Sequence, residues 1–376
     1  MYTVCSLFAR CSHSYINEVS QWVVSLLTAL WKTSGPTDSG RHRRVRGGFQ
    51  PRACNHKLPA AGGEPPLRRT DAIHLGLMLA ALGLTYLLPF ELLLLSYAIL
   101  GPAHYLTEIS WLHDRRYFLP DRGLAVLLVF LALVLAFIEN AKWFGFLVWV
   151  AFVICVVSAA AATFMQRTLL LLAAATLTAV MYEYGTPFAV VGILLPTLVH
   201  VSLFTLVFMV LGAYRAGSKA QLALLVAYLS AIGIILVLPP SAQTVLPVFA
   251  SMAQEYFGNV AQALGRTLGV PDLKLDTRFT SLLAFVYTYH YLNWFIKADV
   301  IRWNQVPRAR LALVAIVSAA STALYFYNYV WGFSVLLALS LIHVFLEFPL
   351  NGISLRELGA ITGRTLMRSA RRPASL

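Results

Sequence analysis

Charged residues are scarce in this chain, and their scarcity excludes an ordinary soluble globular fold. Asp, Glu, Lys and Arg make up 12% of the 376 residues, whereas hydrophobic residues make up 59% and the mean hydropathy is +0.71. Soluble globular domains contain about a quarter charged residues. Among the charged residues the acidic ones are fewer, with 16 Asp and Glu against 29 Lys and Arg.

The resulting net charge of +13 does not indicate a nucleic-acid-binding protein. The basic residues form no single patch but are spread over the short polar segments between apolar runs. This distribution is typical of loops on the cytoplasmic side of a membrane protein, where Lys and Arg contact anionic headgroups. The expected partners are therefore membrane lipids and not nucleic acid.

Cysteines are also few, and their spacing excludes the usual cysteine-based sites. The chain has Cys5, Cys11, Cys54 and Cys155, with no C-x-x-C pair and no Cys/His spacing typical of zinc. The sequence therefore predicts neither a disulfide framework nor a zinc-finger type of site.

The sequence is rich in long apolar runs. A run of about 20 apolar residues is long enough to cross the hydrocarbon layer, and the backbone inside that layer must be helical to satisfy its own polar groups. The fifth run is short, so nine spans are an alternative to ten. We predict an all-α polytopic transmembrane bundle, in a multi-pass protein of a bacterial inner membrane. The ten predicted spans are residues 72–88, 90–112, 123–137, 143–163, 168–182, 187–213, 221–238, 279–296, 311–330 and 332–348.

The positions of Lys and Arg predict the orientation and the domain organisation. Every short loop with an excess of basic residues falls on one side, so both termini are expected in the cytoplasm. The bundle is expected over residues 71–350. Its outer loop, 239–278, is predicted to contain a surface helix at 245–268. Residues 1–70 read as a disordered basic tail, with native translation starting further downstream as an alternative, and 351–376 as a basic cytoplasmic tail.

Four histidines lie deep inside the predicted spans, where ionisable side chains are costly and usually functional. They are His104, His200, His290 and His343. The four spans that carry them are predicted to run in the same direction, and each histidine falls between the middle and the cytoplasmic end of its span. The sequence therefore predicts that the four imidazoles form one layer.

Two of these histidines share a local pattern, H-x-x-x-E, which adds Glu108 and Glu347. This spacing places an imidazole and a carboxylate on one helix face. The carboxylates are predicted to be either metal ligands or acceptors that orient the rings. Such a donor set suits non-haem iron, copper or zinc. A histidine pair could instead hold haem, and hydrogen-bonded contacts between helices without any metal are a further alternative.

Aromatic residues surround His290 in the sequence and predict a binding surface for a long apolar molecule. Tyr287, Tyr291 and Trp294, together with Asn293, are the predicted substrate-lining residues. The alternative is a belt of aromatic side chains at the membrane interface.

The segment Gly101-Pro-Ala-His104-Tyr-Leu-Thr-Glu108 resembles the G-x-P-H-G-x-x-D segment of the bacterial membrane β-carotene 15,15′-dioxygenases, a family related to proteins of bacteriorhodopsin synthesis. The proline is shifted by one place, Glu replaces Asp, and no histidine follows the acid. The resemblance implies a polytopic protein that cleaves β-carotene to retinal with iron held by transmembrane histidines. It implies that His104 is an iron ligand and that Glu108 supports it.

The function expected from the sequence is a membrane-embedded non-haem iron oxygenase acting on an apolar substrate from the lipid phase, such as a carotenoid. A multi-pass transporter is an alternative, although no convincing inverted repeat is visible and no Arg or Asp lies in mid-span. A haem-binding or assembly protein without a catalytic metal is another alternative.

Overall fold

The structure, a computed structural model, is helical throughout the part of the chain that it describes. That part comprises residues 69–115, 122–138, 140–160, 163–184, 188, 190, 192, 194–240, 277–296 and 306–370. The predicted N-terminal tail and the predicted surface helix of the 239–278 loop lie outside these residues. The elements are α2 (Arg69–Leu87), α3 (Pro89–Leu95), η1 (Ser96–Leu100), α4 (Gly101–Arg115), α5 (Arg122–Leu135), α6 (Ala141–Ala160), α7 (Phe164–Tyr184), η2 (Leu195–Phe204), α9 (Thr205–Ala216), α10 (Lys219–Val237), α12 (Thr277–Ile296), α14 (Arg308–Tyr327) and α15 (Tyr329–Ala370).

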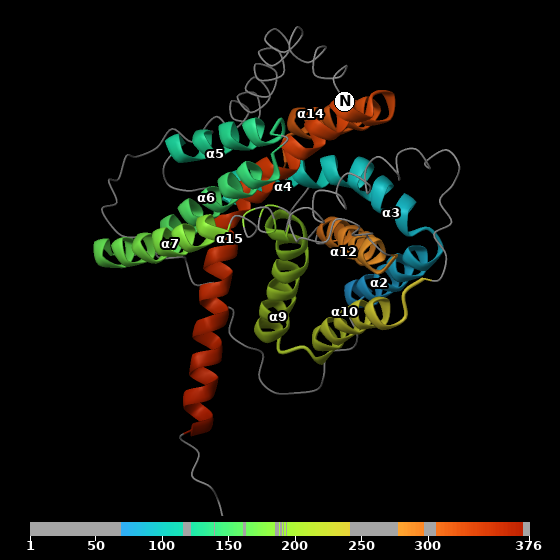
Figure 1. The fold of residues 1–376 in the computed structure, drawn as a ribbon. Helices are drawn as coiled ribbons and strands as arrows, with labels where there is room; N and C mark the ends of the chain where they lie inside the picture. Colours follow the sequence, from blue (N-terminus) through green and yellow to red (C-terminus); the bar gives the residue numbers. More distant parts are fainter. Residues whose placement is uncertain are drawn as a thin grey trace, which may run out of the picture. The chain divides into compact units, whose positions relative to one another are not determined.

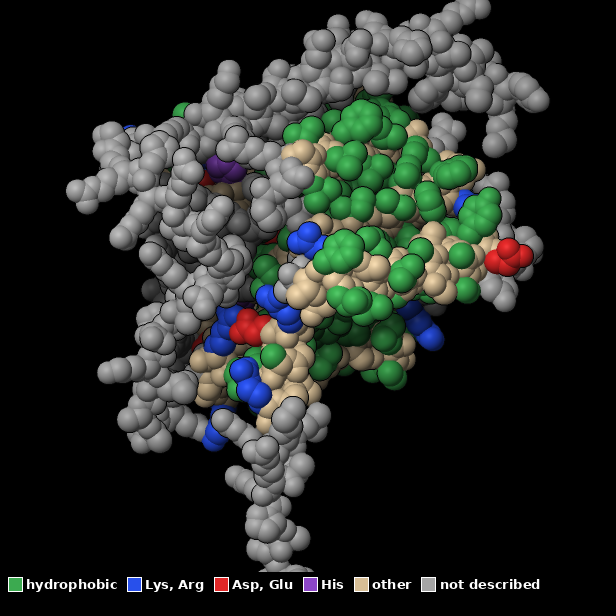
Figure 2. Space-filling view, turned by 90° about the vertical axis from the view of Figure 1, so that its left-hand side faces the viewer, with side chains coloured by type: hydrophobic (Ala, Val, Ile, Leu, Met, Phe, Trp, Pro, Cys, Tyr) green, Lys and Arg blue, Asp and Glu red, His purple; other side chains and the backbone are tan. Residues whose placement is uncertain are grey.

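The described helices confirm the predicted all-α fold with membrane-spanning character. Seven of them are long and apolar enough to cross a membrane, and α5 and α6 contribute shorter apolar segments. One side of the molecule accordingly shows a broad hydrophobic surface over the described residues (Figure 2). The number of spans and the side on which the termini lie stay predictions.

The chain divides into two compact units, residues 1–66 with 307–311 and residues 67–306 with 312–376. Within the second unit, α12 packs against α2 and α3, and α15 packs against α4, α5 and α6. The ribbon in Figure 1 follows α15 past α4 and then along α9. These packing partners place α4, α12 and α15 around the candidate site.

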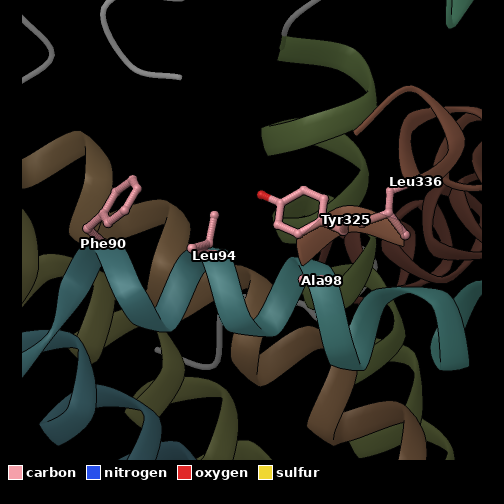
Figure 3. Close-up of a cluster of buried hydrophobic side chains, with 5 residues drawn as sticks. All are labelled: Phe90, Leu94, Ala98, Tyr325 and Leu336. Atoms are coloured by element: carbon pink, nitrogen blue, oxygen red, sulfur yellow. The ribbon is translucent and has the colours of Figure 1, made fainter. Parts of the chain in front are cut away.

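A cluster of buried apolar side chains fixes α3 and η1 against α14 and α15. It consists of Phe90, Leu94, Ala98, Tyr325 and Leu336, and Figure 3 shows the Tyr325 side chain pointing toward Leu94. The turn between α14 and α15 is tight. A Cβ atom added at Gly332 would lie 2.1 Å from the Tyr325 Cα, so this close approach requires glycine.

The last helix differs from the prediction, which ended the tenth span at Phe348. Instead α15 continues through Pro349 to Ala370. Proline has no N–H to donate to the carbonyl four residues earlier, which normally breaks a helix. Here the Cys155 thiol of α6 donates to that carbonyl, Phe345 O, with an Sγ···O distance of 3.6 Å. A contact between two helices thus replaces the bond that proline removes.

Beyond Pro349, the remaining part of helix α15 packs against α9. Ile361 and Leu358 pack against Val207 and Leu211 of α9. The Arg215 Nε atom donates to a Glu357 carboxylate oxygen at 3.1 Å, and its Nη2 atom bonds the other oxygen. The first part of the predicted C-terminal tail is therefore a helix packed on α9.

Candidate metal centre

The four predicted histidines come from four different helical elements and meet in the second unit. His104 lies on α4, His200 on η2, His290 on α12 and His343 on α15. The His104, His200 and His343 side chains are buried, and His290 is half-buried. The elements pack as α4 with α12, α12 with η2, η2 with α15 and α15 with α4. These contacts form a closed circuit of four helical elements, and each element contributes one histidine.

Ring distances around this circuit are short and similar. The ring centroids of His104 and His290 are 4.8 Å apart, and those of His290 and His200 are 5.6 Å apart. The centroids of His200 and His343 are 5.0 Å apart, and those of His343 and His104 are 5.3 Å apart. The Nε2 atoms of His104 and His290 are 3.1 Å apart, and those of His200 and His343 are 3.2 Å apart. The structure thus brings together all four histidines that the sequence placed in one layer.

Both predicted glutamates join this cluster, and their contacts suggest the role of ligand over the role of ring-orienting acceptor. Glu108 Oε2 lies 3.2 Å from His104 Nε2, and Glu347 Oε2 lies 3.4 Å from His200 Nε2. A carboxylate that only orients a ligating ring contacts its other nitrogen. Within the described part of the chain, the Nδ1 atoms of His104 and His200 have no hydrogen-bond partner.

A threonine that the sequence did not single out orients the His290 ring. The Thr205 hydroxyl is hydrogen-bonded to His290 Nδ1 at 2.9 Å, and the Thr205 side chain is buried. When Nε2 is the ligand atom, Nδ1 carries the ring proton and donates it to the hydroxyl oxygen. Threonine in an apolar helix usually bonds a carbonyl of its own helix, so its residue type alone gives no signal of this role.

The π-helical backbone of η2 explains how His200 and Thr205 reach the same site. Positions five apart on an α-helix are separated by about 140° around its axis. In a π-helix the backbone bonds from residue i to i+5, which brings such positions close to one face. Pro196 lies in the first turn of η2.

Aromatic side chains enclose the cluster on the α4 and α12 side. Tyr105 stacks on His343 with a centroid separation of 4.4 Å, and its hydroxyl bonds the Tyr291 hydroxyl at 2.6 Å. The rings of Tyr291 and Trp294 lie 5.0 Å and 5.5 Å from the His104 ring. Tyr105 directly follows His104, but its sequence neighbourhood alone did not indicate this stacking.

The predicted substrate-lining residues differ in their distance from the histidines. Trp294 is held in place by its Nε1 atom, which donates to the Thr107 hydroxyl at 3.0 Å. Tyr287 contacts Tyr291 with a centroid separation of 5.8 Å and so lies one ring further out. Asn293 is buried on the same helix. Their contact with a substrate stays a prediction.

The donor atoms fit a metal ion. His104, Glu108 and His343 offer ligand atoms that all lie within 4.8 Å of one another, and so do His200, His343 and Glu347. Nitrogen and carboxylate donors of this kind suit iron, zinc, copper or manganese. Cys155 is the only cysteine among the described residues, and its thiol bonds the backbone, so no thiolate joins the set.

The two carboxyl groups strengthen the case for a cation. Glu108 and Glu347 are both buried, and their carboxyl groups are close enough to interact electrostatically. Two buried carboxylates at close range repel unless a proton or a cation lies between them. A metal bound by the surrounding imidazoles would supply that positive charge.

Comparisons of the chain with protein-family models, with curated proteins and with solved structures found no match.

Proposed function

We propose that this protein is a membrane-embedded, non-haem metal oxygenase that acts on an apolar substrate dissolved in the bilayer. The observation that carries the proposal is the convergence of four imidazoles and two carboxylates among helices long and apolar enough to span a membrane. Polar groups of this number are costly in such a place unless they serve a site.

Iron is the metal we favour. A centre of histidines and carboxylates with open positions is the usual setting for non-haem iron that reacts with dioxygen. Haem is disfavoured by the ring spacing. Two axial nitrogens on opposite faces of a haem iron are about 4 Å apart with the macrocycle between them. The paired Nε2 atoms here are only 3.1 Å and 3.2 Å apart.

The chain's own residues have separable tasks in this proposal. His104, His200, His290 and His343 hold the metal through Nε2, and Thr205 fixes the orientation of one ring. The bound iron would supply the activation of dioxygen. Tyr291 and Trp294 cover His104, which limits the access of water to the site.

The substrate class follows from the surroundings of the site. The outer faces of the helices are rich in exposed hydrophobic side chains, so an apolar molecule can reach them from the lipid phase. The segment 101–108, which resembles the membrane β-carotene dioxygenases, carries both His104 and Glu108 of the cluster. We therefore propose a carotenoid as the substrate.

The test is to purify the full-length protein in detergent, measure its metal content, and supply β-carotene under air. We expect bound iron and dioxygen-dependent formation of a cleaved, shorter-wavelength product. His343→Ala should lower the bound iron and abolish product formation. His113→Ala is the matched control, because this histidine lies at the end of α4, outside the cluster, beside Asp114 at 3.4 Å. Failure to bind any first-row metal, before or after reconstitution, contradicts the proposal.

A further inference from the structure

The six donor residues of the candidate centre can be divided into two triads of the same composition, with His343 close to the donors of both. One triad consists of His104 and Glu108 from α4 and His290 from α12. The other consists of His200 from η2 with His343 and Glu347 from α15. Each triad has two histidines and one glutamate, and each takes its glutamate from a helix that also supplies a histidine four residues earlier.

The distances within the triads match as well. The Nε2···Nε2 separations are 3.1 Å in the first and 3.2 Å in the second. Glu108 Oε2 lies 3.2 Å from Nε2 of His104 on its own helix, whereas Glu347 Oε2 lies 3.4 Å from Nε2 of His200 on a different element. Two nitrogens bound to one metal at about 2.1 Å, at an angle between 90° and 109°, are about 3.0–3.4 Å apart. Each histidine pair therefore already has the spacing of neighbouring ligands on one ion.

The triads adjoin through their carboxyl groups. The Glu108 carboxyl group lies close to that of Glu347, and His343 lies within 4.8 Å of donor atoms in both triads. Carboxylates placed between two metal-binding sets are suited to bridge two ions, which neutralise the repulsion between them.

A single ion explains this arrangement less well. One divalent ion would balance the two carboxylate charges. Six protein donors, however, would fill an octahedral coordination sphere and leave no position for an exogenous ligand. A catalytic metal keeps an open position. With both carboxylates bridging, each of two ions has two imidazoles and two carboxylate oxygens as donors. Every donor residue is then used, and each ion keeps open positions.

From this symmetry we infer that the centre binds two metal ions, one in each triad, bridged by Glu108 and Glu347. The inference rests on the proposed function only in that both require metal at this site. It adds the number of ions and the residues that hold each.

The experiment is a metal-to-protein ratio, measured by mass spectrometry of the metals in the purified full-length chain, after loading with excess ferrous iron and removal of unbound metal. Two ions per chain are expected. One ion per chain overturns this inference and leaves the proposed function standing. No bound metal overturns the proposed function as well, so the two failures are distinguishable.

Variants then assign the ions to the triads. His104→Ala and His200→Ala should each lower the ratio from two to one, and His113→Ala should leave it at two. Each of these two variants disrupts one triad and is called a single-triad variant. A metal-to-protein ratio of zero in either of them would overturn the assignment of one ion to each triad. The Mn²⁺-loaded wild-type protein should give the electron paramagnetic resonance spectrum of a coupled pair, and each single-triad variant that of an isolated ion. A spectrum of isolated ions in the wild type also overturns the inference.

Discussion

Helices α7 and α12 are almost equal in length, with 21 and 20 residues, but they differ in almost every other respect. On α7, Met181 is the only buried residue among those whose burial is described. On α12, ten residues are buried, and six of these carry a hydroxyl group on tyrosine, serine or threonine. The exposed helix α7 is apolar enough to cross a membrane, whereas the buried helix α12 is not, which is the reverse of a soluble protein.

The difference shows what each helix requires from its sequence. A lipid-facing helix needs only apolar side chains of sufficient number, since lipid is as apolar as the side chains themselves. A helix that contributes to a polar site must give up hydrophobicity for groups that find partners inside the bundle. Consequently α7 is among the seven helices apolar enough to span a membrane and α12 is not, although α12 provides His290.

The strongest way to test this comparison is to remove the proposed metal ligand of α12. We expect His290→Ala to weaken metal binding by more than about 100-fold, because a ligand itself is lost whereas its supporting groups cost 10- to 100-fold. Metal titration of the purified variant measures the effect. A matched change on α7, Leu171→Ala, should not alter metal affinity. Equal effects of the two changes would contradict the assignment of the site to α12.

A smaller effect is expected from the group that orients His290. Thr205→Val keeps the shape of the side chain but removes the hydroxyl bonded to His290 Nδ1. Metal affinity should fall by about 10- to 100-fold, with membrane insertion unchanged.

The control for Thr205 is Thr168→Val on α7, whose hydroxyl bonds the Phe164 carbonyl of its own helix at 3.1 Å. If Thr205→Val bound metal as tightly as the control does, its hydrogen bond would have no supporting role.

A third prediction concerns stability. The Thr288 hydroxyl of α12 is hydrogen-bonded to the Ser96 hydroxyl of η1 at 2.7 Å, and both side chains are buried. Thr288→Val leaves the serine without this partner and should lower the free energy of unfolding by about 1–3 kcal/mol. Reversible unfolding in mixed detergent micelles measures it. On α7, the corresponding exposed change Thr176→Val should stay within about 0.5 kcal/mol. A loss of equal size at Thr176 would show that α7 packs against a partner.

Much of this contrast could be predicted from the sequence. Apolar runs located the helices, because length and hydrophobicity are sufficient to define them. The depth of His104, His200, His290 and His343 predicted their meeting, because histidines at one level on a bundle have few places to point except inward.

Other features could not be predicted, because they depend on contacts between distant segments. Pro349 normally indicates a helix end, and only the neighbouring Cys155 thiol shows why α15 continues. Whether Glu108 and Glu347 bind metal or orient a ring depends on which imidazole nitrogen they face. The side-chain rotamers decide this, and the spacing H-x-x-x-E is the same in both cases.

The π-helical segments have a consequence for how such a centre can be gained or lost. A π-helical turn contains one residue more than the α-helical turn that it replaces, so the single turn of η1 corresponds to a one-residue insertion. Removal of one residue from 96–100 would restore a regular α-helix and turn His104 by about 100° relative to the preceding segment. The helix would remain long enough and apolar enough to cross the membrane, while its imidazole would leave the cluster. The loss of a single codon would thus remove His104 from the cluster and leave the helix able to cross the membrane.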